Sequence, residues 1–147
     1  MNQPDDYLSL STDPPQALAS YPVLVELPVQ WGDQDAFGHV NNVVFFRWIE
    51  SSRIAYAQRI GLLPHRHNPL GDESENDGNQ DSAAKTLATA HGGLILAAVS
   101  CNYRQQVSYP DSLVIGARTS RIGNSSLTME HLLYSQAQQA VIADGQA

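Results

Sequence analysis

The stretch of sequence that decides the fold reads WGDQDAFGHVNN over residues 31–42 and VVFFRWIESSR over residues 43–53. Its first part has the glycine and polar residues of a loop, and its second part opens a predicted helix from about Asn42 to Ile60. The first turns of this helix are apolar nearly all round, whereas a surface helix shows a narrower apolar stripe. We therefore expect other structure to wrap the helix.

Both ends of the predicted helix carry local signals. Asn41 and Asn42 are good N-cap residues, because a side-chain oxygen can accept a hydrogen bond from the free N–H groups of the first turn. At the other end, Gly61 can adopt the left-handed conformation that commonly ends a helix. Glu50 and Arg53 have the spacing of an ion pair on one helix face.

Alternating apolar residues predict strands on both sides of the helix. Residues 23–31 alternate before it, and Pro28 indicates an edge or an irregular part of that strand. After the helix, we expect strands over 94–107, 113–122 and 127–135, and the start of a last strand at 140. One strand, a buried helix and a β-meander make a single α+β domain.

The predicted domain occupies residues 21–147. Residues 1–20 carry three prolines and several Ser and Asp residues without a sustained period, which indicates a disordered tail. The segment of about 65–90 is polar and acidic. It predicts a flexible insertion within the domain rather than a linker, because neither flank could fold alone.

Composition argues against several classes of protein. Eight of the 15 acidic residues lie in the tail and the insertion, which leaves seven against eight Lys and Arg and no basic surface for nucleic acid. No apolar run approaches the roughly 18 residues of a membrane-spanning helix. The acidic start is unlike a secretory signal, and the single cysteine, Cys101, excludes an intramolecular disulfide. We expect a cytoplasmic protein.

The loop over residues 31–42 also brings together the groups that acyl transfer needs. Asp35 offers a carboxylate, Gly38 lets a ligand approach the backbone, and free N–H groups open the helix. A carboxylate can attack or activate water, while those N–H groups stabilise the oxyanion that forms. The structural alternative is that Asp35 caps the helix start or closes an Asx-turn.

The same residues carry a resemblance to a known family. The pattern Asp-x-Asp-x-x-Gly-His-Val-Asn-Asn of residues 33–42, with the aromatic-rich helix after it, resembles the signature of the 4-hydroxybenzoyl-CoA thioesterase-like branch of the hotdog superfamily. The resemblance covers roughly residues 22–64 and 91–147. It implies a hotdog fold, in which an antiparallel sheet wraps a long central helix, and a homodimer or homotetramer with active sites at the dimer interface. It also implies an acyl-CoA thioesterase, which hydrolyses a CoA thioester to a carboxylate and free CoA without a metal or other cofactor.

The resemblance further implies roles for individual residues. The catalytic carboxylate of the family falls on Asp35, as nucleophile or general base, and the backbone N–H that serves as oxyanion donor falls on Asn42. Gly38 is then the close-approach glycine, and we expect Val40 and its neighbour in the motif, the cap residue at position 41, to contact substrate. His39 could be a general base. Related enzymes have an apolar residue there, which favours orientation of the loop or substrate contact instead.

Other chemistry-bearing residues predict structural roles. Asp33 organises the loop by hydrogen bonds. Cys101, in mid-strand with nothing near it in sequence to lower its pKa, is expected to be a buried small hydrophobe. His65, His67 and Asp72 could hold a metal, but they lack a helical His-x-x-x-His frame and lie in the predicted insertion, so we expect none.

Two features depart from the family pattern. The polar insertion around residues 71–82 is longer than usual. The last predicted strand stops at Ala147, partway along the family's last strand, and we expect its neighbour to lack some hydrogen-bond partners. These departures keep a second hypothesis open, a hotdog domain that binds acyl-CoA or an acyl carrier without turnover. A hotdog dehydratase or an acyl-ACP thioesterase is a third; the dehydratase is less favoured because the motif resembles the thioesterase branch.

Overall fold

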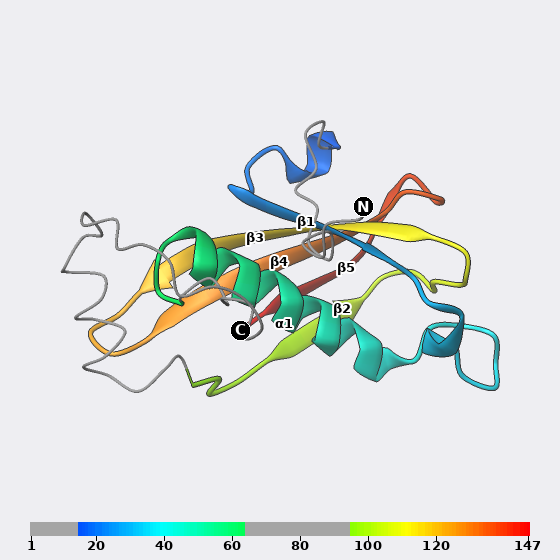
Figure 1. Cartoon of the computed structure of the whole chain (residues 1–147), viewed down its shortest axis with the longest axis horizontal. Coiled ribbons are helices and arrows are strands. Elements are labelled where there is room, and N and C mark those ends of the chain that lie inside the picture. Colours follow the sequence, from blue (N-terminus) through cyan, green and yellow to red (C-terminus); the bar gives the residue numbers. More distant parts are fainter. Residues whose placement is uncertain (1–14, 64–94) are drawn as a thin grey trace, which may run out of the picture.

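A computed structural model of the chain describes residues 15–63 and 95–147 (Figure 1). Its elements, in chain order, are η1 (Gln16–Leu18), β1 (Val23–Pro28), η2 (Trp31–Asp33), α1 (Asn42–Arg59), β2 (Ser100–Tyr103), β3 (Ser112–Ile122), β4 (Leu127–Ser135) and β5 (Ala140–Gln146). The strands form one antiparallel sheet in the order β1-β3-β4-β5-β2. This confirms the predicted α+β architecture. The predicted insertion of about 65–90 lies outside the described residues.

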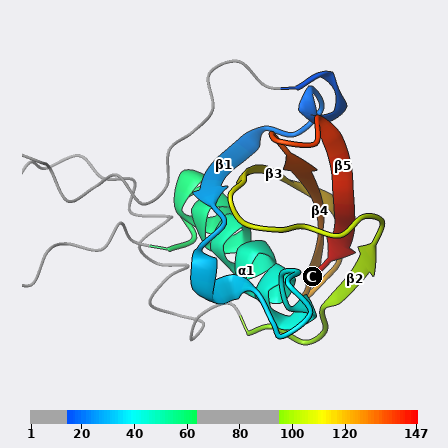
Figure 2. The ribbon, with the colours of Figure 1, turned by 90° about the vertical axis from the view of Figure 1, so that its right-hand side faces the viewer.

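The sheet curves around α1, which lies against its concave face (Figure 2). The helix contributes Phe45, Trp48 and Ile49 to the main core, and each is at most 2% exposed. The facing strands contribute side chains of the same kind, among them Leu113, Ile115, Leu133 and Ile142. Burial of each large apolar side chain stabilises the fold by about 1.5–3 kcal/mol, which holds the helix in the sheet. The arrangement is the helix-in-sheet architecture of the predicted hotdog fold.

The sheet wraps α1 as predicted, and the described residues leave part of the helix surface away from the sheet exposed. Val43 in its first turn is 67% exposed and Ile54 is 37% exposed. Glu50 and Arg53 form the predicted ion pair, with 3.7 Å between their charged atoms. The described sheet can bury only the face that it contacts, which leaves the apolar residues on the opposite face exposed.

The local signals at both helix ends act as predicted. The Asn41 side chain accepts a hydrogen bond from the Val43 N–H at 3.1 Å, which caps the first turn. Gly61 has φ +76°, and the Leu62 N–H donates to the Ala57 carbonyl at 2.9 Å. This closing hydrogen bond, with a left-handed residue just past the helix, is the Schellman motif.

Two predicted strands are shorter in the structure. The strand expected over 23–31 ends at Pro28 on the sheet edge, and a 3-10 turn follows. The strand expected over 94–107 pairs with β5 only from Ser100 to Tyr103. Pairing stops there because the N–H groups of Arg104 and Gln105 both donate to one acceptor, the Ile142 carbonyl, so the regular ladder is broken.

Residues 15–20 belong to the folded domain, so the tail predicted over 1–20 is too long; residues 1–14 lie outside the described part. Leu18 in η1 is fully buried on the outer face of the sheet, with Leu24 and Val114. Gly116 of β3 makes room for this covering segment, since a Cβ there would lie 2.6 Å from the Tyr21 ring. The outer face of the sheet therefore has a small core of its own. The polar residues and prolines of residues 1–20 did not predict it.

The last strand remains paired to its end. β5 pairs with β4 from Ser135 to Glu130. Beyond these pairs, Ala147 exchanges two main-chain hydrogen bonds with Met129, of 2.8 and 3.0 Å. The neighbour of β5 therefore has its partners as far as Met129.

Candidate active site

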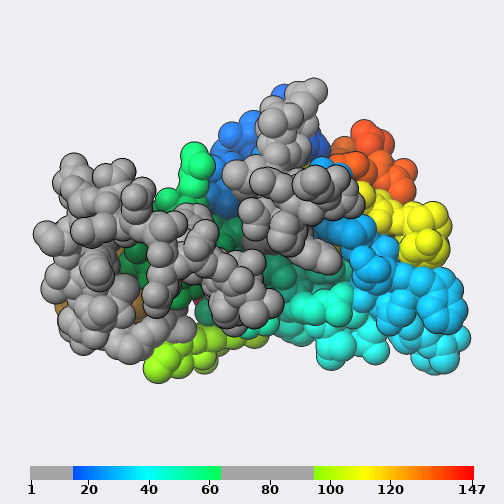
Figure 3. All heavy atoms as spheres, in the orientation of Figure 1, coloured from blue at the N-terminus to red at the C-terminus, as the bar shows by residue number. Residues whose placement is uncertain are grey.

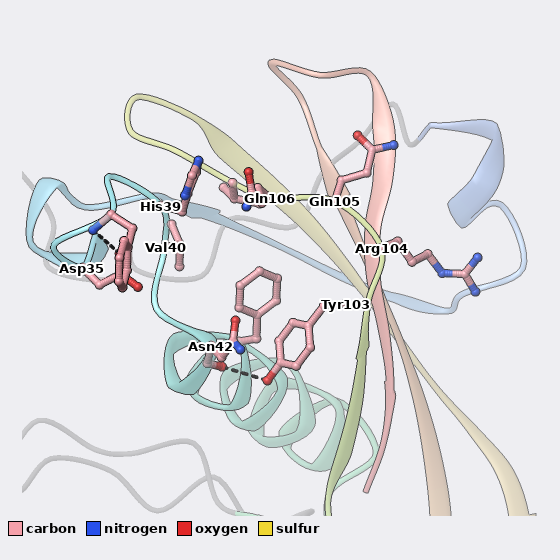
Figure 4. Close-up of a pocket in the computed structure, with 11 residues that line it drawn as sticks. Asp35, His39, Val40, Asn42, Tyr103, Arg104, Gln105 and Gln106 are labelled. Atoms are coloured by element: carbon pink, nitrogen blue, oxygen red, sulfur yellow. Dashed lines mark hydrogen bonds between the residues drawn. The ribbon is translucent and has the colours of Figure 1, made fainter.

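A pocket of about 350 Å³ lies where the loop before α1 meets the segment after β2 (Figure 4). The loop and the helix line one side with Asp35, Phe37, His39, Val40, Asn42 and Phe45. The end of β2 and the residues after it line the other side, over residues 103–107. The two segments lie next to each other at one end of the molecule (Figure 3). The pocket therefore joins parts of the chain more than 60 residues apart.

The loop is closed by a tight turn over residues 35–39. The Asp35 N–H donates to the His39 carbonyl at 2.9 Å, and the Gly38 N–H donates to the Asp35 carbonyl at 3.0 Å. Gly38 has φ +78°, a left-handed conformation that favours glycine. Nothing lies within 4 Å of the position that a Cβ would take. The structure therefore requires this glycine for its backbone conformation, and close approach to a ligand stays a prediction.

The Asp35 side chain forms a structural turn and also lines the pocket. Its Oδ1 accepts a hydrogen bond from the Phe37 N–H at 2.8 Å, which makes the Asx-turn of the structural alternative. The same exposed side chain lines the pocket, and its Oδ2 has no partner among residues 15–63 and 95–147. The Asx-turn therefore holds the carboxylate in place while one oxygen is free for chemistry.

Asp33 organises the loop, as predicted. Its side chain is only 5% exposed, and Oδ2 accepts from the Gln30 N–H at 2.8 Å. Oδ1 accepts from the guanidinium of Arg47, one turn into α1. The Asp33 carbonyl also accepts from the Asn41 N–H at 2.9 Å. These contacts fix the loop against the helix start.

The helix start supplies a free donor beside the pocket. Asn42 is the first residue of α1 and lines the pocket. Its main-chain N–H has no acceptor within the described segments, whereas its carbonyl accepts from the Tyr103 hydroxyl at 3.1 Å. N–H groups at a helix N-terminus carry partial positive charge, so this group can stabilise a negative oxygen.

A second segment, residues 104–109, ties the loop down from the other side. The Val40 N–H donates to the Val107 carbonyl at 2.7 Å. The Ser108 hydroxyl donates to the Gly38 carbonyl at 3.1 Å, and the Tyr109 N–H donates to the side-chain oxygen of residue 34 at 3.0 Å. Sequence reasoning missed this segment as a pocket wall. One residue could have indicated it: Gln105 is polar at a position where the alternation of the preceding strand calls for an apolar residue.

The structure brings together four of the six predicted site residues. Asp35, His39, Val40 and Asn42 line one pocket. Asn41 caps the helix with its side chain, and it and the neighbouring Gly38 do not line the pocket. The half-buried His39 has its backbone carbonyl engaged by the turn. Its chemical role stays a prediction.

Charged and titratable groups near the pocket have defined partners. Arg104 points away from Asp35 and Asn42 in Figure 4, and its Nε donates to Asp144 Oδ1 at 2.6 Å. A hydrogen bond from the Asn102 side chain, together with the Arg104 charge, lowers the pKa of Asp144. The half-buried Cys101 packs against the main core, and burial raises its pKa to about 11. It is therefore a thiol at neutral pH, without nucleophilic character.

Two further classes of site find no support in the described part of the chain. No three His, Cys, Asp or Glu side chains in residues 15–63 and 95–147 come together as a metal site would require. The histidines at positions 65 and 67 lie outside those residues. Within the same ranges, no helix has the length and apolar character needed to span a membrane.

Solved structures show the same fold. A thioesterase from Thermus thermophilus, complexed with coenzyme A and Zn, is 28% identical with a TM-score of 0.62, over 87% of this chain and 77% of that one. The PA2801 protein from Pseudomonas aeruginosa is 25% identical with a TM-score of 0.60, over 84% of this chain and 78% of that one. Both likenesses cover most of the chain.

Sequence comparison gives the family. The Bacillus subtilis protein YsmA is 30% identical over 113 residues, which are 77% of this chain. The chain spans about three fifths, 61%, of the length of that relative. Residues 29–147 match the family model of the thioesterase-like superfamily. The pocket, the fold and this match agree, and the chain belongs to the thioesterase-like superfamily.

Proposed function

We propose that the protein is an acyl-CoA thioesterase, which hydrolyses a CoA thioester to a carboxylate and free CoA. One observation carries the proposal: a single pocket is lined by a carboxylate with a free oxygen, on Asp35, and by a helix-start residue with a free N–H, Asn42. Hydrolysis of a thioester needs both groups. The CoA-bound thioesterase from Thermus thermophilus supports CoA as the part of the substrate that leaves.

In the proposed mechanism, the thioester carbonyl enters with its oxygen at the Asn42 N–H. In one route, the carboxylate of Asp35 attacks the carbonyl carbon, the C–S bond breaks as the CoA thiolate leaves, and water then hydrolyses the resulting anhydride to the acid and the free Asp35 carboxylate. In the other route, Asp35 removes a proton from the water that attacks the carbonyl carbon, and the C–S bond breaks as the CoA thiolate leaves and takes up that proton. In both routes, negative charge develops on the carbonyl oxygen during the attack, where the helix N-terminus stabilises it. No metal or other cofactor takes part in this proposal.

The remaining predicted residues have supporting roles in the proposal. Val40 gives an apolar contact to the acyl group, and His39 contacts the substrate from the same side of the pocket. Gly38 and Asn41 act through main-chain conformation and through the cap that holds the helix start. A direct acid–base role for His39 is the less favoured alternative.

The first experiment replaces the carboxylate with an amide of equal size. Asp35→Asn keeps an oxygen that can accept from the Phe37 N–H, so the turn and the fold are expected to survive. The rate of thiol release from an acyl-CoA is expected to fall by at least about 100-fold, since a group acting as base or nucleophile is lost. Glu50→Gln, which removes an exposed carboxylate on α1, serves as the control with unchanged rate. A wild-type rate in folded Asp35→Asn protein excludes Asp35 as the catalytic group.

The second experiment removes the proposed oxyanion donor itself. Asn42→Pro deletes the main-chain N–H, and proline is favoured at the first position of a helix. The residue before it, Asn41, has φ −63° and ψ +138°, which a following proline accepts. We expect kcat to fall by about 100- to 1,000-fold, whereas Asn42→Ala, which keeps the N–H, stays within a few-fold of wild type. Equal rates for the two variants would rule out this N–H as the donor.

A second candidate function is an acyl-CoA-binding domain without turnover. The Asx-turn of Asp35 favours it, because it gives the carboxylate a structural purpose that needs no catalysis. A non-hydrolysable acyl-CoA thioether would then raise the melting temperature, while no thioester tested would release thiol. Release of thiol that depends on Asp35 selects the enzyme instead.

The proposal includes a homodimer or homotetramer. β2 is an edge strand of the sheet, and Tyr103 in it and Val99 just before it are 42% and 37% exposed. An edge strand with exposed apolar side chains is a ready template for pairing with another chain. Light scattering on the purified protein measures the assembly, and a monomeric mass excludes it. The cytoplasmic location stays a prediction from the sequence.

A further inference from the structure

One pocket residue that the proposed mechanism does not use, Tyr103, spans the gap between β2 and the start of α1. Its hydroxyl donates to the Asn42 carbonyl at 3.1 Å. Its ring stands edge-on against Phe45, with ring centroids 5.0 Å apart and planes at 86°. Figure 4 shows this side chain reaching from β2 to the helix beside the pocket. Tyr103 is therefore held at both its ring and its hydroxyl.

The pocket cannot extend straight down into the main core. Phe45 is 2% exposed and packs edge-on against Trp48, at 5.2 Å between ring centroids. Ile49, one turn further along the helix, is 1% exposed, and Ile142 on the facing strand is fully buried. These residues belong to one close-packed cluster, so an acyl chain has no room beneath Phe45.

Tyr103 bounds the pocket on the side that lies between α1 and β2. Successive side chains of a strand alternate, so Cys101, two residues earlier, lies on the same face of β2 as Tyr103. Cys101 is only half-buried and packs against the edge of the main core cluster. Without the Tyr103 ring, the next side chain along this face of β2 would be the smaller one of Cys101.

The volume of the pocket also limits the size of the acyl group. Its volume of about 350 Å³ lies at the small end of the roughly 300–1,000 Å³ of ligand pockets. Part of that volume must hold the thioester group and the end of the CoA arm. What remains suits a compact acyl group.

We propose that Tyr103 determines acyl-chain length: its ring bars the gap between β2 and α1, so the substrate is the thioester of a short or ring-sized acid. This inference rests on the proposed thioesterase function. It assigns the limit to the bulk of the ring, while the hydroxyl only anchors the ring to the helix start.

The experiment compares butanoyl-, octanoyl- and palmitoyl-CoA as substrates of three proteins. The wild type is expected to hydrolyse butanoyl-CoA with higher kcat/KM than palmitoyl-CoA. Tyr103→Ala opens the gap, and each further methylene buried there is expected to raise kcat/KM by up to about fourfold, equivalent to about 0.8 kcal/mol. The octanoyl-to-butanoyl ratio should therefore rise at least about tenfold over wild type. Tyr103→Phe, the matched control, keeps the ring and should keep the wild-type ratio.

The results that overturn the inference are distinct from failure of the proposed function. A wild type that prefers palmitoyl-CoA, or a folded Tyr103→Ala protein with an unchanged ratio, overturns it. A change of ratio in Tyr103→Phe equal to that in Tyr103→Ala overturns the assignment to ring bulk. Tyr103→Leu replaces Tyr103→Ala where the smaller residue prevents folding, and the same comparison applies.

A binding measurement tests the inference if no thioester is hydrolysed, an outcome that contradicts only the proposed enzyme function. Calorimetry with the thioether analogues butyl-CoA and octyl-CoA should then show the same shift of preference in Tyr103→Ala. Equal preference in the two variants overturns the inference.

Discussion

Acidification is expected to weaken the fold through one buried histidine. His131 lies in the middle of β4 with 1% of its surface exposed, and its Nδ1 is 2.8 Å from the Ser52 hydroxyl on α1. The Ser52 hydroxyl lies within hydrogen-bond distance of both Nδ1 and the Ile49 carbonyl, which is 2.9 Å away. Nε2 of His131 is buried and has no hydrogen-bond partner in the described segments.

The magnitude follows from the pKa of this imidazole. Burial, and to a smaller extent the positive charge of Arg53, lower the pKa of His131 from 6.5 to about 4. Between these two pH values the unfolded chain binds a proton that the folded protein does not, so the free energy of unfolding falls as the pH falls. The effect is absent well above pH 6.5 and complete below about pH 4. One pKa unit corresponds to about 1.4 kcal/mol, so the total loss is about 3 kcal/mol.

Urea unfolding of the wild type and of His131→Leu, from about pH 7 to about pH 4, measures this loss. A leucine side chain cannot bind a proton, so the variant should lack about 3 kcal/mol of the pH dependence that the wild type shows. Carboxylates that titrate in both proteins cancel in the comparison. Equal pH dependence in the two proteins, or a His131 imidazole that titrates near pH 6.5 in NMR spectra of the folded wild type, refutes the reasoning.

Two predictions concern the packing on the outer face of the sheet and the capping of α1. Gly116→Ala places a Cβ 2.6 Å from the Tyr21 ring and should destabilise the fold by about 1–3 kcal/mol, measured by urea unfolding. Adding Tyr21→Ala to this variant should recover part of the lost stability. A Gly116→Ala protein as stable as the wild type would contradict the close packing of Gly116 against Tyr21. Asn41→Ala removes the cap of α1 and should cost about 1 kcal/mol, measured by thermal unfolding, whereas Asn41→Ser should recover most of it.

The helix and its ends were predictable because their causes are local. Asn41 caps an N–H two residues away, and Gly61 takes the left-handed conformation immediately after the helix. The strand over 127–135 was also predicted with its observed bounds. Asp35 and Asn42 are seven residues apart on one loop, so the motif was enough to predict that both line one pocket.

The opposite wall of the pocket depends on the order of the strands. Tyr103 reaches Asn42 from 61 residues away, and Val107 receives the Val40 N–H from the far side of the same loop. Both contacts exist because β2 pairs with β5 and then leaves it at Arg104, where two N–H groups share one acceptor. A run of alternating residues shows that a strand can form, but its length and neighbours depend on pairing with distant strands.

Local sequence was therefore sufficient for α1, for the chain order of the strands and for the carboxylate beside the helix start. The burial of Leu18 and His131, the end of β2 and the position of Tyr103 arise from side chains that meet only after the sheet has curved around α1. The physical reason is range: caps, turns and alternation act over a few residues, whereas cavities and buried groups result from packing between segments far apart in the chain.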